Sequence, residues 1–213
     1  MNAPKWTTKF RSSSAFQTIW KRAVPLVLIL ALGGCVSYGE PAAGFSNAAV
    51  GAAYVPLAAT DLLTERYGAA VVIAPGIAVT NAHNANLVDP KSVIASLSDY
   101  DLLYFHTSQS AAVATAAPYD GERVIAYGQG AGNELRMARG VVKHFWPAAF
   151  GYLSDAGPGF SGGPVVDAST GALVGITYGF FDDEDPAGRL MVAYDSAFVL
   201  KELANSKIAA KPN

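Results

Sequence analysis

The chain has 213 residues, of which 51% are hydrophobic and 15% are charged. This composition excludes an intrinsically disordered chain and allows one or two domains with a sizeable core. The formal net charge is −2, and it becomes −7 beyond residue 34, because the first 34 residues hold five basic residues and no acidic one. An acidic domain lacks the basic surface that nucleic acid requires, so no nucleic-acid partner is expected.

Residues 1–34 have the pattern of a secretory signal peptide. Their basic residues precede a short apolar run over 23–32, and small residues follow the run before Cys35. The run is about half of the ~20 residues that a membrane-spanning helix needs, which argues against a permanent transmembrane segment. Leu32-Gly33-Gly34-Cys35 also resembles the lipobox of bacterial lipoproteins, which are cleaved before the cysteine and acylated on it. The alternative is an ordinary signal peptide in which this cysteine stands by chance.

The lipobox resemblance implies an exported protein of the cell envelope, anchored to a membrane by lipid on Cys35. Two or more acyl chains would hold the protein firmly, whereas one would not. The next residue, Val36, is not an aspartate, which in this resemblance favours the outer membrane. Cys35 is the only cysteine, so no internal disulfide can form. Residues 35–60 are rich in Ala, Gly and Pro and predict a tether, with an edge strand near 52–57.

From residue 61 onward, short apolar runs alternate with turn signals, which is typical of an all-β sandwich or barrel. Residues 61–67 predict a short helical turn before the first strand. The apolar spacing over 195–210 predicts a closing helix, which Asp195 or Ser196 can cap. The predicted strands are Ala70–Ala74, Ile77–Thr80, Ser92–Leu97, Leu102–His106, Glu122–Gly128, Glu134–His144, Val165–Val166, Ala172–Tyr178 and Leu190–Tyr194.

The stretch Gly157-Pro158-Gly159-Phe160-Ser161-Gly162-Gly163-Pro164 places a serine between glycines. Glycines let the backbone turn tightly and bring its N–H groups close to a substrate carbonyl. Ser161 therefore fits a nucleophile, and the amides of Gly159 and Ser161 fit an oxyanion hole. The alternative for this stretch is a Gly/Pro turn between two strands.

A nucleophilic serine needs a base, and the base needs an acid that orients it. His83 lies upstream of the serine, an aspartate enters the apolar strand at Asp101, and no histidine follows Ser161. This order excludes the α/β-hydrolases, in which the histidine follows the serine. It leaves the order His, Asp, Ser of the chymotrypsin type.

At these residues the chain resembles the trypsin-like (chymotrypsin-fold) serine endopeptidases, and without disulfides it is most similar to their short bacterial members. The resemblance covers roughly residues 62–207. It implies an all-β fold of two antiparallel β-barrels with a C-terminal helix, in one protease domain over 61–210, with the site in the cleft between the barrels. The boxes that carry it are Thr80-Asn81-Ala82-His83, Asp101-Leu102-Leu103-Tyr104, Gly159-Phe160-Ser161-Gly162-Gly163-Pro164 and Gly175-Ile176-Thr177-Tyr178-Gly179.

The resemblance implies a catalytic triad of His83, Asp101 and Ser161, which hydrolyses peptide bonds of a protein or peptide substrate through an acyl-enzyme. His83 and Asp101 are only 18 residues apart, which is shorter than usual in the family, so the first barrel must be trimmed. Asp99 is the alternative acid, because it lies two residues away on the same strand face. Asp101 is favoured because the apolar strand begins there.

Asp155 lies six residues before Ser161, where trypsin-like members place a pocket acid that pairs with substrate Arg or Lys. Its alternative role is to stabilise the turn that follows. The strand Thr177-Tyr178-Gly179 is expected to pair with the substrate backbone. His106 and His144 are expected in surface or packing roles, since neither stands at metal-ligand spacing, and no metal or cofactor is expected.

Two other functions compete with the peptidase. A trypsin-fold lipoprotein without turnover would act as a binding or chaperone-like envelope protein, and the compressed spacing between His83 and Asp101 supports it. The intact set of His83, Asp101 and Ser161 argues against it. A structural envelope protein would make Ser161 only a turn residue.

Overall fold

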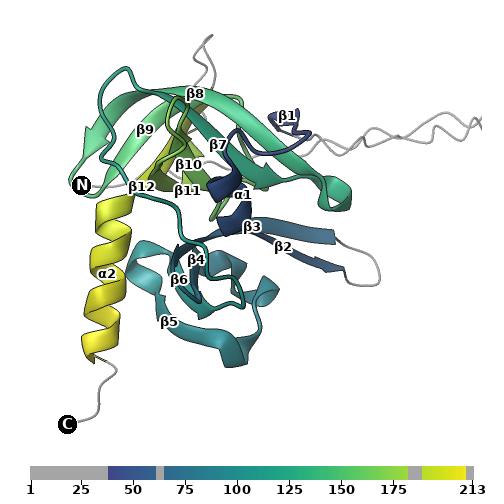
Figure 1. Ribbon diagram of the computed structural model, residues 1–213, viewed down its shortest axis with the longest axis vertical. Helices are drawn as coiled ribbons and strands as arrows, with labels where there is room; N and C mark the ends of the chain where they lie inside the picture. Colours follow the sequence, from purple (N-terminus) through teal and green to yellow (C-terminus); the bar gives the residue numbers. More distant parts are fainter. Residues whose placement is uncertain (1–37, 61–64, 182–188, 210–213) are drawn as a thin grey trace, which may run out of the picture. The chain divides into compact units, whose positions relative to one another are not determined.

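The computed structural model describes residues 38–60, 65–181 and 189–209. Contacts divide the chain into two units, Met1–Gly34 and Cys35–Asn213, and the described residues all belong to the second. They form two antiparallel β-sheets, followed by a C-terminal helix, α2 (Ser196–Ala209) (Figure 1).

The first sheet has the strand order β2-β3-β4-β6-β5. The strand β3 is apolar and buried from Gly68 to Ile73, as expected for a strand covered on both faces. Three short 3₁₀ helices fill the connections, η1 and η2 between β4 and β5, and η3 between β5 and β6. The bounds are β2 Tyr54–Thr60, β3 Glu65–Ala74, β4 Ile77–Asn81, η1 Ala82–Leu87, η2 Pro90–Ser92, β5 Val93–Leu97, η3 Ser98–Tyr100 and β6 Leu102–His106.

The second sheet closes into a six-stranded barrel, because the long strand β8 pairs with β7 on one side and with β9 on the other. The short strand β1 adds to β8 outside this ring. The bounds are β1 Glu40–Pro41, β7 Arg123–Gln129, β8 Leu135–Trp146, β9 Ala149–Ser154, β10 Pro164–Asp167, β11 Leu173–Phe181 and β12 Arg189–Asp195, with a 3₁₀ helix η4 at Ala131–Asn133.

The described residues form two apolar cores. Inside the barrel, large buried side chains such as Phe150, Tyr152 and Phe160 pack together. The other core joins the first sheet to the barrel strands β7, β10 and β11, through side chains such as Tyr127 and Ile176, and it includes Val199 of α2. The Tyr104 hydroxyl donates a hydrogen bond to the carbonyl of Val199 at 2.8 Å, which ties the helix to β6. Among the described helices, none is both long enough and apolar enough to cross a membrane.

The predicted fold class is confirmed: the structure is mostly β, with a closed barrel, a second sheet and a C-terminal helix. In the first sheet the edge strands β2 and β5 are not paired with each other in the described residues. The predicted helical turn over 61–67 is strand from Glu65 onward, and residues 61–64 lie outside the described residues. The strand β9 was not predicted from the sequence.

Residues 38–60 differ from the predicted tether. They form β1, a short helix α1 (Ala48–Ala53) and β2, which agrees with the edge strand expected near 52–57. The guanidinium of Arg136 donates hydrogen bonds to the carbonyls of Tyr38 at 2.7 Å and Gly39 at 2.6 Å. The chain is therefore held to the barrel from residue 38 onward.

Candidate active site

His83 and Asp101 form a doubly hydrogen-bonded pair where β4 ends and β6 begins. The His83 Nδ1 atom lies 2.7 Å from Asp101 Oδ2, and the His83 backbone N–H donates to Asp101 Oδ1 at 2.9 Å. With a proton on Nδ1, the carboxylate leaves Nε2 of the imidazole as an acceptor. The pair therefore has the arrangement of a general base held by an orienting acid.

The backbone explains how 18 residues suffice between His83 and Asp101. Strands β4 and β6 are neighbours, and Asn81 at the end of one pairs with Leu102 at the start of the other. The Asp101 carbonyl accepts hydrogen bonds from the N–H of Ala82 at 2.9 Å and from Asn81 Nδ2 at 3.2 Å. The residues between the two strands include β5, which pairs with the far side of β6, and the chain then returns to start β6 beside the end of β4. His83 and Asp101 therefore meet.

Asp101 itself has a left-handed backbone, with φ 51° and ψ 39°, and it terminates η3. Aspartate adopts this conformation more readily than most residues. The alternative acid, Asp99, lies exposed within η3 and makes no hydrogen bond to His83 in the described residues. Of the two aspartates, only Asp101 contacts the imidazole.

Ser161 lies in a loop of the barrel made of two successive tight turns. The Phe160 N–H donates to the Gly157 carbonyl at 3.1 Å, and the Gly163 N–H donates to the Phe160 carbonyl at 2.9 Å. Gly159 and Gly162 have φ values of +94° and +79°. A Cβ on Gly162 would stand 2.1 Å from Thr80 Oγ1, so only glycine fits there.

The Ser161 loop is tied to the first sheet through the serine's own carbonyl. This carbonyl accepts hydrogen bonds from the backbone N–H of Ala69 and from Asn84 Nδ2, both at 3.1 Å. The N–H groups of Gly159 and Ser161 have no acceptor among the described residues. They are thus available to a ligand, as an oxyanion hole would require.

His83 and Ser161 line the same cavity, which has a volume of about 440 Å³. In the described part of the chain, no hydrogen bond joins the imidazole to the serine hydroxyl, and such contacts are often long before a substrate binds. The lining residues are Tyr67, His83, Asn84, Gly157, Pro158, Gly159, Ser161, Thr177, Tyr178, Gly179, Phe180 and Met191.

The wall of this cavity is largely uncharged. All three residues predicted to bind the substrate backbone, Thr177, Tyr178 and Gly179, line it. The hydroxyl of Thr177 is hydrogen-bonded to that of the buried Tyr152 at 2.8 Å. Asp155 is exposed and lies outside the lining, and its carbonyl accepts the N–H of Gly39. The structure thus separates Asp155 from the pocket in which the sequence placed it.

The other two histidines lie away from this cavity. His106 is exposed at the end of β6, and His144 is exposed on β8 beside Trp146, with their ring centroids 6.2 Å apart. Among residues 38–60, 65–181 and 189–209, no three His, Cys, Asp or Glu side chains are grouped as metal ligands would be.

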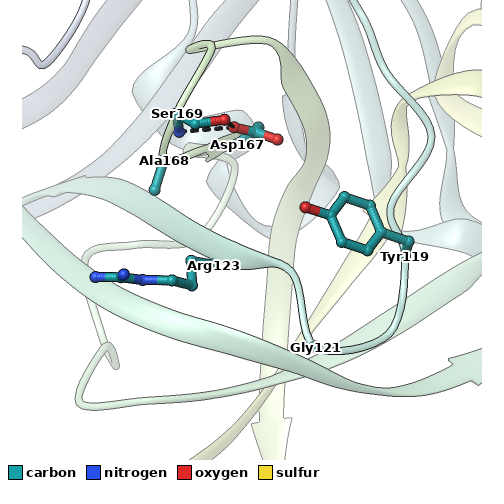
Figure 2. Close-up of a pocket in the computed structure, with 6 residues that line it drawn as sticks. All are labelled: Tyr119, Gly121, Arg123, Asp167, Ala168 and Ser169. Carbon is teal, nitrogen blue, oxygen red and sulfur yellow. Dashed lines mark hydrogen bonds between the residues drawn. The ribbon is translucent and has the colours of Figure 1, made fainter.

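A second cavity, of about 380 Å³, shares no residue with the first. Figure 2 shows its lining, including Tyr119, Arg123 and the hydrogen bond between Asp167 and Ser169. That bond from the Ser169 hydroxyl is the main reason that the pKa of Asp167 is lowered to about 2.

Beside this second cavity, Glu122 is only 1% exposed. Its Oε2 accepts the N–H of Tyr119 at 3.1 Å, while Oε1 has no partner in the described residues. Burial, reinforced by the charge of Asp167, raises the pKa of Glu122 to about 7. Sequence reasoning missed this carboxyl, because a glutamate at the start of a strand gives no signal that it is buried.

Comparison with known proteins agrees with this geometry. Residues 80–176 match the family model of the trypsin-like peptidase domain, and this range contains His83, Asp101 and Ser161. No curated protein sequence matches the chain.

Several solved structures share the fold. A serine endoprotease from Yersinia pestis superimposes with a TM-score of 0.62 and 19% identity, covering 74% of this chain and 65% of that one. The HtrA-type protease AlgW with a tripeptide superimposes with a TM-score of 0.57 and 21% identity, covering 72% of this chain and 59% of that one. An inactive serine-to-alanine mutant of Rv3671c from M. tuberculosis H37Rv superimposes with a TM-score of 0.62 and 18% identity, covering 83% of this chain and 98% of that one. The chain thus spans less than two thirds of the first two proteins, and it has the fold of a trypsin-like serine protease.

Proposed function

We propose that the protein is a serine endopeptidase that uses Ser161 as nucleophile, His83 as general base and Asp101 as the orienting acid. The observation that carries the proposal is the pair of hydrogen bonds from His83 to Asp101, beside a cavity that Ser161 also lines. The match of residues 80–176 to the trypsin-like peptidase domain supports the same assignment.

In this mechanism the Ser161 hydroxyl attacks the carbonyl carbon of a peptide bond while His83 Nε2 accepts its proton. Asp101 holds the imidazole tautomer and stabilises the imidazolium that forms. The N–H groups of Gly159 and Ser161 stabilise the oxyanion. His83 then returns the proton to the leaving amine, and water repeats the sequence on the acyl-enzyme.

The substrate backbone would pair with Thr177-Tyr178-Gly179 as an added strand, which the position of all three residues in the cavity wall supports. We expect an uncharged, apolar side chain next to the cleaved bond, because Phe180 and Met191 line the cavity and Asp155 does not. A peptide library scanned at that position tests the preference, and cleavage confined to Arg or Lys would reject it.

We further propose that Cys35 carries the lipid that anchors the protein to the cell envelope, at the outer membrane. The lipobox Leu32-Gly33-Gly34-Cys35 supports this. Cys35 and residues 1–34 lie outside the described residues. Replacing Cys35 with serine should abolish palmitate labelling and the recovery of the protein in the membrane fraction. Unchanged labelling would reject the anchor.

A fluorophosphonate probe tests the nucleophile directly. The wild-type protein should be labelled and Ser161→Ala should not, while the exposed control Ser110→Ala should be labelled like the wild type. Labelling that persists in Ser161→Ala would reject the assignment.

The second candidate is a trypsin-fold envelope protein that binds clients without cleaving them. The lack of a hydrogen bond between His83 and Ser161 in the described residues fits this candidate as well as it fits a protease without substrate, so activity has to separate the two. This candidate predicts that the wild type neither reacts with the probe nor cleaves casein.

A further inference from the structure

The loop that precedes Ser161 is contacted by two residues from the first described segment of the chain. The Gly39 N–H donates a hydrogen bond to the Asp155 carbonyl at 3.1 Å. The Tyr38 ring packs against Gly157, because a Cβ added to that glycine would stand only 2.4 Å from the Cγ atom of the ring. The loop is therefore supported from a distant part of the sequence.

These contacts extend to the residue next to Ser161. Phe160 is fully buried in the core of the barrel, and a Cβ added to Gly39 would stand 2.8 Å from the Cζ atom of its ring. The same loop includes Gly159, whose N–H is a donor of the proposed oxyanion hole. We call residues 155–160 the oxyanion loop.

Arg136 of β8 fixes Tyr38 and Gly39 to the barrel. Its side chain is buried, and its guanidinium donates to the Tyr38 carbonyl at 2.7 Å and to the Gly39 carbonyl at 2.6 Å. Hydrogen bonds from a charged donor are stronger than those between neutral groups. The two residues are thus held by a strand of the barrel, and not only by the loop that they touch.

Arg189 links the Tyr38 ring to the oxyanion loop a second time. Its guanidinium carbon lies 4.7 Å from the centroid of the Tyr38 ring, and its Nη1 donates to the Ala156 carbonyl at 3.2 Å. A guanidinium over the face of an aromatic ring is attracted by the ring. An aromatic ring at position 38 therefore supports the loop at both Ala156 and Gly157, and alanine would remove both supports.

Gly157 lies between the Tyr38 ring and the cavity that Ser161 lines. It contacts the ring, and it also belongs to the wall of the cavity together with Pro158 and Gly159. The donors of an oxyanion hole are effective because they are aimed before the reaction begins. A shift of Gly157 toward the space of a lost ring would therefore change the aim of the donor that follows it.

The peptide groups on the two sides of Gly159 are held differently. The Gly159 carbonyl accepts the N–H of Gln129 at 2.9 Å. The Gly159 N–H belongs to the preceding peptide group and has no acceptor in the described residues. The preceding group is the one that Tyr38 supports, through Gly157.

We propose that Tyr38 is a positioning residue of the peptidase, whose ring holds the oxyanion loop so that the Gly159 N–H points into the cavity. The inference rests on the peptidase proposed above. It adds to the site a residue outside 80–176, the range that matches the trypsin-like peptidase domain. Because the support acts on the oxyanion, it should affect the transition state more than the binding of the substrate.

The experiment compares Tyr38→Ala, Tyr38→Phe and Glu40→Ala in the full chain. Tyr38→Ala should lower kcat by about ten- to a hundred-fold, which is less than the loss of a whole oxyanion donor, and change KM by less than about twofold. Tyr38→Phe keeps the ring and should retain a kcat close to that of the wild type. Glu40→Ala should do the same, because it removes the ion pair with Arg139 and leaves the contacts of Tyr38 and Gly39 in place.

A peptidyl trifluoromethyl ketone reads the oxyanion hole directly. The Ser161 oxygen bonds to the ketone carbon, the π electrons of the carbonyl move to its oxygen, and His83 takes the hydroxyl proton, so the adduct carries an oxyanion. The inhibition constant of this ketone should rise in Tyr38→Ala by the same factor by which kcat/KM falls, because both depend on the same donors.

Three results would overturn the inference while the peptidase stands. The first is a Tyr38→Ala variant with the wild-type kcat and inhibition constant. The second is a Tyr38→Phe variant that is impaired as strongly as Tyr38→Ala. The third is a loss of kcat in Tyr38→Ala that equals the loss of folded protein measured by circular dichroism, which would make the role of Tyr38 purely structural.

Failure of the peptidase itself is recognised separately. If the fluorophosphonate probe does not label the wild type, the proposed function fails, and the role of Tyr38 fails with it. If the probe labels the wild type, only the variants at position 38 decide the inference.

Discussion

His83 and Asp101 are held together through the Asp101 carboxylate, whereas Ser161 lies in a loop that is held by backbone hydrogen bonds and whose glycines leave no room for a side chain. On the first sheet, the carboxylate and the carbonyl of Asp101 accept four hydrogen bonds. In the barrel loop, positive φ angles and close backbone contacts at Gly159 and Gly162 set the position of the serine. The half of the site that holds His83 and Asp101 should therefore be sensitive to loss of charge. The half that holds Ser161 should be sensitive to added side-chain volume.

Asp101→Asn should have the largest effect, and it should act on activity. Asparagine also adopts the left-handed backbone, and its carbonyl can still accept the bonds from Ala82 and Asn81. Without the negative charge, kcat should fall by about 10⁴ on the general behaviour of such triads, which corresponds to roughly 5 kcal/mol. Steady-state kinetics measures the loss, and the melting temperature should change little.

Asp99→Asn is the control for that prediction. Asp99 is exposed and does not contact His83 in the described residues, so kcat should remain close to the wild-type value. If Asp99→Asn lowered kcat more than Asp101→Asn does, the acid would be misassigned, and the hydrogen bonds between His83 and Asp101 would not be the ones that matter for activity.

Gly162→Ala should have the next largest effect, and it should act on folding. The added Cβ would stand 2.1 Å from Thr80 Oγ1 and 2.2 Å from the Ala69 carbonyl, in addition to the strain of a positive φ. We expect a loss of about 4 kcal/mol or more in the free energy of unfolding, measured by urea denaturation.

The matched control is Gly121→Ala, because Gly121 also has a positive φ, +77°, but nothing lies within 4 Å of its added Cβ. It should cost only about 1–2 kcal/mol, from backbone strain alone. Equal losses for the two variants would mean that φ, and not the space between loop and sheet, holds Ser161 in place.

Glu122→Gln tests whether the buried carboxyl of Glu122 makes the stability of the barrel depend on pH. Burial raises the pKa of Glu122 to about 7 from an ordinary value of 4.5, so the folded state holds this proton more tightly than the unfolded state. The contribution of Glu122 to stability should therefore be greatest below pH 4.5 and be lost as the pH rises through 7. Glutamine does not titrate. As the pH rises from 4.5 to 7, the free energy of unfolding of the variant should therefore increase by on the order of 1–3 kcal/mol relative to that of the wild type.

Thermal melting at pH 5 and pH 8 measures this gain. The difference between variant and wild type should be larger at pH 8, and the reverse order would contradict a buried, neutral Glu122. Activity should not follow the same curve, because Glu122 does not line the cavity that holds Ser161.

Much of the candidate site could be predicted from the sequence, because the residue types that the proposed triad needs stand in short local boxes. His83, Asp101 and Ser161 each stand in such a box, and alternating apolar runs gave most of the strands. The left-handed backbone of Asp101 could not be predicted, because it depends on how the chain passes from η3 into β6.

The features that sequence reasoning missed depend on distant partners. Residues 38–60 have the composition of a linker, but Arg136, 98 residues away, binds the carbonyl of Tyr38. The strand β9 follows the tight turn after Trp146 and is defined by its pairing with β8 and β12. Asp155 stands at a suggestive offset from Ser161, but the offset does not reveal that its side chain faces water.

Asn84→Ala should have the smallest effect, although Asn84 is the side chain that joins the two halves of the site. Its Nδ2 donates to Thr80 Oγ1 at 3.0 Å on the first sheet and to the Ser161 carbonyl at 3.1 Å in the barrel loop. The loss should cost about 1 kcal/mol of stability. Because Ser161 keeps its bond from Ala69 N–H, kcat should fall only a few-fold.

Asn86→Ala is the control, since Asn86 belongs to the same 3₁₀ helix but is exposed. It should leave both stability and kcat unchanged. A loss of kcat in Asn84→Ala as large as that in Asp101→Asn would show that a hydrogen bond, and not the glycine turns, positions the serine. The contrast between the two halves would then disappear.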